Sequence, residues 1–538
     1  MSTVVEYGSR RFFVVAAVML AALMQLADTT IVNVALPSID GALGASQDEG
    51  AWFITAYIIA NVIVIPLTPW LQSIFGRKRY FALSIAGFTA VSVLCGLAND
   101  TTSEIALRFI QGAFGGGLMV PAQQIIRDTF PPDELGKSQS LFALAVVIGP
   151  TIGPTLGGIL TDDLTWRWVF FVNVLPGIAA ALLVLLFVRD PHAPKRIPVD
   201  AIGIGLLTLG LATMQYVLDE GERNGWFDDS TIVACTVVSV LALVAFVAWE
   251  LWGTKRPAVA LRVFADRNVW SFSIVFFAIG ATMFALIFIQ PQYVQNSLNF
   301  TTTMAGMLLM VRAGMLVLLY PVTTWVASQY KWDLRLVAGG GILVMGLATW
   351  LQTYQMTTNA TFGTFILTQA LGGVGLAFVF VPLMVVLLAG MEQSLVPSAL
   401  ALTRLMQQIG ASVGSAYAAT LLDRNFNTAL SGIAGSINMG STAIATAVTE
   451  HGSQAIGVLT QLATSEAANL SAVSTTQFFA IGTIATTLLP LLMVRRSIVR
   501  SHAPVQMTPP APPAVQAEKG TIQVSERTLR VPVPAGGE

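Results

Sequence analysis

Residues 20–38, LAALMQLADTTIVNVALPS, place one carboxylate, Asp28, inside an apolar run. An ionisable group at the centre of a membrane helix costs at least about 2.5–3.5 kcal/mol, so a carboxylate there is a candidate for function. Burial disfavours the ionised form of a carboxylate and a nearby cation favours it. A helix movement that changes either effect can load and release a proton near neutral pH. The sequence therefore predicts that Asp28 carries a proton.

Polar residues around Asp28 form a stripe along one side of the expected helix. At about 100° per residue, Gln25, Asp28, Thr29 and Asn33 fall within about 140° of one another. This stripe must face protein or water rather than lipid, because polar groups are expensive in hydrocarbon. The first helix is therefore predicted to present Asp28 to other helices or to a cavity.

A second polar face is expected in residues 104–126. Arg108, Gln111 and Gly112 follow an i, i+3, i+4 pattern, so they share one side of a helix. A guanidinium is permanently charged, and Arg108 can either tune the charge state of Asp28 or simply hold two helices together. Both interpretations of the pair stay open at this point. Arg312 and Arg404 also stand in apolar runs, where they are either functional charges or side chains that reach the membrane surface.

The stretch GPTIGPTLGG, residues 149–158, predicts a bent and closely packed helix. Its glycines recur every four residues and give a flat ridge that another helix can approach. Each proline removes a backbone donor and bends the helix, which argues against the alternative of a simple GxxxG dimer. The residues concerned are Gly149, Pro150, Gly153, Pro154, Gly157 and Gly158.

The composition is that of a membrane protein. Of the 538 residues, 54% are hydrophobic and 11% are charged, whereas an average soluble domain has about 25% charged residues. The formal net charge of −1 gives no reason to expect nucleic acid as a partner. Cys95 and Cys235 lie far apart in apolar runs and suggest neither a metal site nor a disulfide framework.

Fourteen apolar runs are long enough to cross a membrane, which takes about 20 mainly apolar residues. The first begins after Arg10 and Arg11 and is too long for a signal peptide, so we expect it to be retained. The runs lie near residues 12–36, 51–72, 80–98, 104–126, 138–160, 168–188, 201–218, 231–252, 269–291, 303–328, 335–355, 361–388, 397–422 and 476–494.

The placement of Lys and Arg predicts the orientation of these spans. With residues 1–11 in the cytoplasm, the inner loops receive most of the basic residues, and the outer loops receive only Arg167, Arg223 and Arg424. The loop at Glu392 is an exception, because it has no basic residue. We therefore expect fourteen helices with both termini in the cytoplasm.

Two segments fall outside the expected spans. Residues 423–475 are rich in Ala, Gly, Ser and Thr, and we expect them to face outward and to include an amphipathic helix. Residues 495–538 contain PPAPP and are expected to form a disordered cytoplasmic tail. The chain has no phosphate-binding loop and no nucleophile motif, and its three histidines lie in loops or the tail. Neither an ATP-driven pump nor an enzyme is expected, and no cofactor or metal is implied.

Several motifs together resemble the major facilitator superfamily, and within it the fourteen-span drug:proton antiporter branch. LADTTIVNVALP (26–37) resembles the signature of the first helix, and LRFIQGAFGG (107–116) is similar to the RxxQGxG motif of the fourth. GPTIGPTLGG resembles the antiporter motif of the fifth helix, and WRWVFFVNVLPG (166–177) resembles the opening of the sixth. The resemblance runs from about residue 12 to 494 and is strongest to the inner-membrane pump subunits of tripartite multidrug exporters.

The loop between the second and third spans departs from the family pattern GxLADRxGRK. Here it reads PWLQSIFGRK (69–78), which keeps Gly76, Arg77 and Lys78 but places Ser73 where the acidic residue belongs. The cytoplasmic gate that the family builds around this acid must therefore work differently in this chain.

The resemblance implies an all-α integral membrane fold with two six-helix bundles, related by a pseudo-twofold axis, and two inserted helices. Residues 12–188 would form the N-terminal bundle, 201–252 the inserted pair and 269–494 the C-terminal bundle. Transporters of this kind bind substrate near the midplane between the bundles and alternate access by rocking.

The resemblance also implies proton-coupled export of hydrophobic or amphiphilic compounds, that is, multidrug efflux across the inner membrane, driven by the proton gradient. Asp28 would bind the proton, Arg108 and Gln111 would tune it, and residues 149–158 would couple bundle movement and limit leak. An apolar cavity with Met and aromatic residues would allow broad specificity. Its expected lining comprises Met24, Gln25, Asn33, Met119, Phe380 and Arg404.

Two other functions fit the same architecture. One is a dedicated exporter of one endogenous metabolite, such as a fatty acid or a siderophore-like product. The other is a solute importer, against which the antiporter-like ridge of residues 149–158 argues. The outward segment 423–475, with the resemblance to tripartite pumps, suggests a periplasmic adaptor and an outer-membrane duct as partners.

Overall fold

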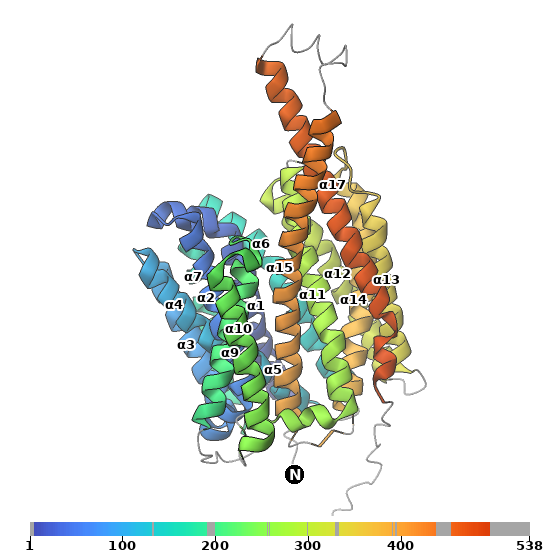
Figure 1. Ribbon diagram of the computed structural model, residues 1–538. Coiled ribbons are helices and arrows are strands. Elements are labelled where there is room, and N and C mark those ends of the chain that lie inside the picture. The colour runs from blue at the N-terminus through green and yellow to red at the C-terminus, as the bar shows by residue number, and fades with distance from the viewer. Residues whose placement is uncertain are drawn as a thin grey trace, which may run out of the picture. The chain divides into compact units, whose positions relative to one another are not determined.

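The computed structural model describes residues 5–494, apart from 132–133, 191–199, 255–256, 258, 299, 329–332, 390, 393–394 and 437–452. Every regular element in these ranges is a helix (Figure 1). Twelve described helices are long and apolar enough to cross a membrane, and a thirteenth qualifies if the bent pair Thr303–Leu319 and Pro321–Ala327 forms one span. The chain is therefore an all-helical, multi-pass membrane protein.

The first six spans form the N-terminal bundle. Their ends follow local sequence signals: Gly44 ends the first helix in a left-handed conformation, with a φ of +65°, and Ser46 and Glu49 form a capping box at the start of the second. The helices are α1 (Gly8–Leu43), α2 (Gln47–Phe75), α3 (Arg77–Leu97), α4 (Thr101–Gly116) continued by α5 (Met119–Thr129), α6 (Leu135–Asp163), and α7 (Trp168–Phe171) followed by α8 (Val174–Phe187).

Two helices follow that belong to neither bundle, α9 (Ala201–Glu220) and α10 (Ser230–Ala248). Asp200 and Asp229 cap their N-termini by accepting backbone N–H bonds. The two helices pack against each other, and α9 packs against α2. Most of their surface faces away from the rest of the chain, as expected for helices that contact lipid.

The C-terminal bundle begins after a short 3₁₀ turn at Leu261–Ala265. Its helices are α11 (Arg267–Asn296), α12 (Thr302–Ser328), α13 (Leu334–Thr353), α14 (Phe362–Leu388), α15 (Val396–Ser436), and α17 (Ser453–Ala485) continued by the 3₁₀ segment Thr486–Leu492.

The two bundles use the same pattern of helix packing. In the first, α1 packs on α6 and α8, α4 packs on α2 and α3, and α3 packs on α8. In the second, α11 packs on α15 and α17, α14 packs on α12 and α13, and α13 packs on α17. Between the bundles, α6 packs on α12 and α15 on α2, which are equivalent pairs under this correspondence. The internal repeat expected of two six-helix bundles is therefore present.

The expected count of fourteen spans is compatible with the structure. The remaining helix, α15, is 41 residues long but is too polar for a composition-based test, because its first half carries Thr403, Arg404, Gln407 and Gln408. It lies in the centre of the molecule beside α11 and α2 (Figure 1). Contact with protein on several sides explains why this helix can be polar.

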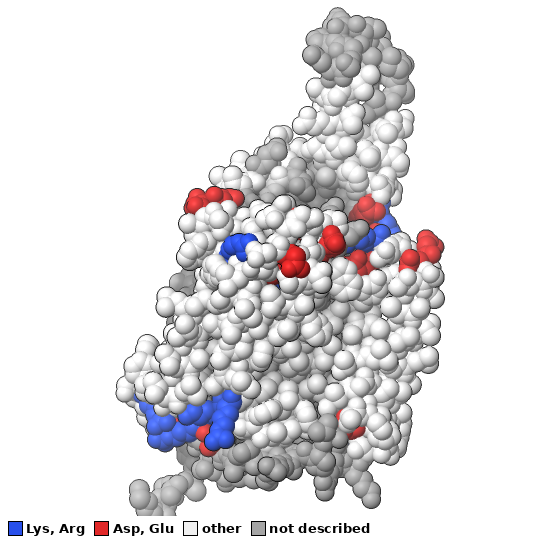
Figure 2. Space-filling view, turned by 90° about the vertical axis from the view of Figure 1, so that its left-hand side faces the viewer, with Lys and Arg blue, Asp and Glu red and all other residues white. Residues whose placement is uncertain are grey.

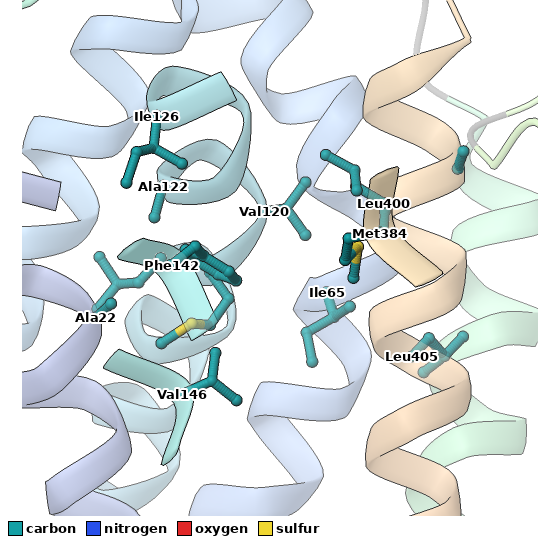
Figure 3. Packing of buried hydrophobic residues seen from close by; sticks show 14 of the residues in the cluster. Ala22, Ile65, Val120, Ala122, Ile126, Phe142, Val146, Met384, Leu400 and Leu405 are labelled. Atoms are coloured by element: carbon teal, nitrogen blue, oxygen red, sulfur yellow. The ribbon is translucent and has the colours of Figure 1, made fainter. Parts of the chain in front are cut away.

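One apolar core joins the bundles (Figure 3). Ile65 and Val120 from the first bundle and Met384 and Leu400 from the second lie in the same cluster of buried residues. Polar contacts also cross the boundary, since Gln123 Nε2 lies 3.2 Å from the sulfur of Met384. In this state the bundles are packed together at the level of this cluster.

The two ends of the molecule differ in charge. Figure 2 shows Lys and Arg side chains gathered at one end and Asp and Glu side chains mainly at the other. We call the first the basic end; it is the end at which Figure 1 marks the N-terminus. Arg11, near the start of α1, pairs there with Glu134, at the start of α6. At the acidic end α15 and α17 project beyond the other helices (Figure 1). Within the segment 423–475, the described residues 423–436 and 453–475 continue these two helices. The predicted tail, 495–538, lies outside the described residues.

A candidate proton-coupling site

Asp28 lies at the meeting point of four helical segments. Its side chain is 1% exposed. Arg108 of α4 donates from Nη1 to Asp28 Oδ2 at 2.9 Å, and Gln111 donates from Nε2 to Oδ1 at 3.1 Å. Asn173, between α7 and α8, donates to the same oxygen at 2.8 Å. Asp28, Arg108 and Gln111, which the sequence singled out, therefore lie together in the structure, and their role in proton coupling stays a prediction.

Glycine positions Arg108 by letting α4 approach α2. A Cβ on Gly112 would overlap the backbone carbonyl of Tyr57, and one on Gly116 would lie 2.6 Å from that of Asn61. At this separation Arg108 Nε donates to the Phe53 carbonyl at 3.0 Å, and its guanidinium lies 4.4 Å from the centre of the Tyr57 ring. The charge is therefore fixed by a hydrogen bond and by a cation–π contact.

A hydroxyl completes the network. Ser92 Oγ of α3 accepts from Gln111 Nε2 at 3.2 Å and from Asn173 Nδ2 at 3.0 Å, and it donates to the Phe170 carbonyl at 2.9 Å. Gln111 Oε1 in turn accepts from Arg108 Nη1 at 2.6 Å. The carboxylate, the amides and the hydroxyl thus hold one another, so protonation of Asp28 would disturb every member.

The ridge of residues 149–158 packs against α1, the helix that carries Asp28. A Cβ on Gly157 would lie 2.8 Å from the carbonyl of Ile31, and Gly149 and Gly153 face the neighbouring turns of α1. Thr30 Oγ1 also donates to the Pro150 carbonyl at 3.2 Å. Pro154 lies inside α6, and Gly158 is buried.

The opposite side of α6 meets the other bundle. Gly306 of α12 lies against Thr155, and Thr324 of α12 donates to Ser140 Oγ at 3.1 Å. The α6 helix therefore lies between α1 and the second bundle, and the ridge is already occupied within this chain. A GxxxG dimer through the same glycines would have to displace α1.

The expected cavity residues do not all lie together. Met24, Met119 and Phe380 are buried in the core cluster that joins the bundles, where Phe380 packs 5.5 Å from the Phe276 ring. Gln25 is buried and donates to the Tyr57 hydroxyl at 3.3 Å. Asn33 is exposed on α1, two turns from Gln25. The lining thus stays a prediction for these residues.

The two other arginines of the apolar runs have different surroundings. Arg404 donates to Gln407 Oε1 at 2.6 Å on α15. Arg312 of α12 lies over Gly372 of α14, and within the described part of the chain its Nε has no hydrogen-bond partner. Among the described residues no carboxylate lies within salt-bridge distance of either arginine, and no group of three or more His, Cys, Asp or Glu residues could hold a metal ion.

The loop at the basic end shows how the chain manages without an acid at position 73. Ser73 donates to the Trp70 carbonyl at 2.6 Å, and Gly76 adopts a φ of +83° that favours glycine. Arg77 pairs with Asp128 at 2.6 Å. The backbone N–H of Lys78 donates to Asp190 at 2.7 Å. Carboxylates from two other segments therefore contact this loop.

Sequence reasoning missed three polar residues near Asp28. Asn173 and Ser92 bind the network directly, and Glu104 is a fully buried carboxylate one turn before Arg108. Asn173 lies within the motif WRWVFFVNVLPG, where a polar residue in an apolar run was a usable signal. Glu104 stands at the edge of its span, where a charge is common, and was overlooked for that reason.

Together these features define a polytopic transporter with a buried ion pair in one of two repeated bundles. The sequence matches the family model described as Major Facilitator Superfamily over residues 18–415. The "Multidrug export protein EmrB" of Haemophilus influenzae is 32% identical over 418 residues, which cover 76% of this chain and 80% of that protein. The "Fatty acid resistance protein FarB" of Neisseria gonorrhoeae is 30% identical over 426 residues, 78% of this chain and 82% of that protein.

Solved structures agree on the fold. The proton:xylose symporter XylE superposes with a TM-score of 0.58 at 13% identity, covering 91% of this chain and 98% of that structure. The chain belongs to the major facilitator superfamily.

Proposed function

We propose that this protein is a proton-coupled antiporter that exports hydrophobic or amphiphilic compounds. The observation that carries the proposal is the buried pair of Asp28 and Arg108, in a chain whose relatives include multidrug export proteins. An intramembrane ionisable residue marks ion or proton pathways in transporters. Asp28 can gain and lose a proton, whereas Arg108 stays charged throughout.

Protonation would change the forces across the network in one step. A proton added to Asp28 removes the negative charge that Arg108 faces at 2.9 Å. The uncompensated guanidinium would then favour a new arrangement of α4 relative to α1. Because α6 packs on α1 and on α12, movement of α1 would reach the second bundle. Rocking of one bundle against the other would follow, as in other transporters with repeated bundles.

The basic end is proposed to face the cytoplasm, with the protein in the inner membrane and both termini inside. The distribution of Lys and Arg in Figure 2 supports this orientation, because short cytoplasmic loops are enriched in these residues. Protons would then enter the site from the acidic end. Reporter fusions at Arg79, in the first turn of α3, and at Asn99, in the loop after α3, would test the topology, since only one of them should lie in the periplasm.

Asp28→Asn tests the coupling role. The purified protein would be placed in proteoliposomes with an imposed pH gradient, and export of ethidium would be followed by fluorescence. We expect the proton-driven export to be lost while the protein still inserts and elutes as the wild type does. Asp163→Asn, which removes an exposed carboxylate at the end of α6, is the matched control and should transport normally. Undiminished export by Asp28→Asn would remove this residue from the mechanism.

Export of one endogenous lipid-like metabolite is the second candidate function. The similarity to a fatty acid resistance protein favours it, because a fatty acid is also amphiphilic. A deletion strain grown with a panel of compounds separates the two functions. Sensitivity to several unrelated compounds supports multidrug export, and sensitivity to fatty acids alone supports the narrow exporter.

A periplasmic adaptor and an outer-membrane duct are proposed as partners. The projecting parts of α15 and α17 support this, because they extend past the other helices at the acidic end (Figure 1). Ser471 Oγ donates to the Leu422 carbonyl, and Asn425 donates to Thr475 at 3.2 Å, so the two helices hold each other where the projection begins. Recovery of no adaptor by pull-down from the native membrane, together with full resistance from this chain alone, would contradict the proposal.

A further inference from the structure

Glu104 is a second carboxylate in the same bundle, and the coupling scheme of Asp28 and Arg108 leaves it unused. It lies in the first turn of α4, near the acidic end, and it is fully buried. Among the described residues no N–H or O–H donor is within hydrogen-bond distance of either carboxyl oxygen, and the thiol of Cys95, a weak donor, lies close by. A buried ionised carboxylate without donors is very costly in a medium of low polarity. The location therefore favours the protonated, neutral form of this side chain.

The charges around Glu104 link it to the Asp28 network. Arg108 is four residues further along α4, on the same side of the helix. Arg108, Asp28 and Arg167 act on Glu104 through their charges, and the thiol of Cys95 acts on it as a weak hydrogen-bond donor. Cys95 of α3 in turn contacts Gln111, since its sulfur lies 3.7 Å from Gln111 Oε1. Glu104 thus lies next to the network, on its side toward the acidic end.

Neither of the two nearby arginines, Arg167 and Arg108, pairs with Glu104. Arg167 donates from Nη1 to the carbonyls of Gly96 and Ala98 at 2.7 and 2.9 Å, so its guanidinium caps the end of α3. Arg108 is bound to Asp28, Gln111 and the Phe53 carbonyl. The first-turn N–H groups of α4 are served by Asp100, which accepts from Ser103 at 2.8 Å. Glu104 therefore neither caps the helix nor forms an ion pair.

We propose that Glu104 is a second proton-carrying residue, which takes up a proton at the acidic end and passes it to Asp28. In this step an O–H bond of Glu104 breaks and an O–H bond of Asp28 forms, and the electron pairs stay on their oxygens. Arg108 then exchanges its carboxylate partner, from Asp28 to Glu104. The summed charge of the two carboxyl groups and the guanidinium stays at zero, so no net charge is buried or exposed. Glu104 afterwards regains a proton from outside.

This proposal rests on the proposed proton coupling, but its first test needs no transport. Infrared difference spectra of the purified protein in lipid would be recorded between about pH 5 and pH 9, a range that lies above the ordinary pKa of Asp and Glu side chains, about 4. We expect a C=O band of a protonated carboxylic acid at neutral pH that Glu104→Gln removes. Glu49→Gln, an exposed capping residue at the same end, should leave the band in place. Glu104→Asp should keep such a band and shows that the site accepts an acid.

A Glu104→Gln spectrum that matches the wild type throughout this range would show an ionised Glu104 and overturn the proposal. The second readout is ethidium export from proteoliposomes as the pH on the acidic-end side is varied. Glu104→Gln should lose the acceleration that acidification of this side gives the wild type, without a change in ethidium binding. An unchanged pH profile would also overturn the proposal. Failure of Asp28→Asn to affect export, by contrast, would remove Asp28 from the proposed coupling mechanism, on which the transfer from Glu104 rests.

Discussion

The two bundles share one packing pattern but differ in what they bury. In the first, Gly112 brings α4 against the Tyr57 carbonyl of α2, and in the second, Gly373 brings α14 against the Arg312 carbonyl of α12. The residue four positions earlier is Arg108 in one helix and Gln369 in the other. Arg108 donates to the carboxyl group of Asp28, whereas Gln369 donates to the amide oxygen of Gln352 at 3.3 Å. Among the described residues, this pair of equivalent positions therefore carries a buried ion pair in the first bundle and a pair of neutral amides in the second.

This difference assigns separate tasks to the two halves. Under the proposed coupling, the proton is carried beside the buried pair of Asp28 and Arg108, and among the described residues of the second bundle no buried pair of a carboxylate and an arginine is present. The second bundle, with neutral amides at this position, keeps the same helix packing, so under the proposed function the two bundles can rock as equivalent units. Coupling in one half and symmetric packing in both are therefore compatible.

The largest difference between the two bundles is expected when the buried arginine of each, Arg108 or Arg312, is replaced. Arg108→Met leaves Asp28 buried without its counter-ion, and we expect a cost of about 3–5 kcal/mol in folding free energy together with loss of export. Arg312→Met removes a buried guanidinium with an unpartnered Nε, so we expect stability that is unchanged or higher. Thermal unfolding in detergent and ethidium export measure both effects. Equal losses for both variants would contradict the functional asymmetry.

The glycine contacts should matter in both halves. Gly112→Ala and Gly373→Ala each force a methyl group against a backbone carbonyl, and we expect each to destabilise the protein by about 1–3 kcal/mol. Only Gly112→Ala should also displace Arg108 and impair export. Gly340→Ala is the control, because no atom lies within 4 Å of the place that its methyl group would take, and its effect should be within about 0.5 kcal/mol. Melting curves that do not distinguish Gly112→Ala from Gly340→Ala would show that this contact relaxes freely.

Removing one hydrogen bond near Arg108 or at Gln369 should cost less stability than removing the charge of Arg108. Asn173→Ala removes a donor 2.8 Å from the Asp28 carboxylate, and a bond to a charged group is worth about 1.5–3 kcal/mol. Gln369→Ala removes a bond between neutral amides, worth about 0.5–1.5 kcal/mol. The pH dependence of export should change only in Asn173→Ala, because only there does an ionisable group lose a partner. A changed pH dependence of export in Gln369→Ala would contradict the view that only the first bundle carries the ionisable site.

The smallest effect is expected at the basic end of the first bundle. Burial by itself would raise the pKa of Glu134, but hydrogen bonds from Lys137 and Arg11 outweigh it and lower that pKa below its ordinary value. A lowered pKa in the folded state means that the pair contributes stability above the unfolded value, about pH 4.3, and loses it as the pH falls through the folded value.

Glu134→Gln should therefore cost at most about 1 kcal/mol at neutral pH, as other partly exposed pairs do. The difference in melting temperature from the wild type should shrink below about pH 4. Export at neutral pH should be unaffected, because Glu134 lies outside the buried network. A difference in melting temperature that grows as the pH falls would show that the folded state raises the pKa of Glu134 instead of lowering it.

The sequence by itself determined the membrane class and the positions of most spans, and it predicted a role for Asp28, because apolar run length and one charge in hydrocarbon are local properties. Motifs on separate helices also predicted that Arg108 and Gln111 act with Asp28. The polar helix α15 shows the limit of this argument, since its place in the centre depends on neighbours rather than on composition.

Only the tertiary structure decided which groups complete the site. Asn173 and Ser92 come from segments far from Asp28 in the chain, and no spacing rule links them. The structure also showed that Glu104 is buried, because whether a charge at the edge of a span meets water depends on the helices around it. The physical reason is the same in each case: burial and hydrogen bonding arise from helix packing, which a sequence pattern specifies only one helix at a time.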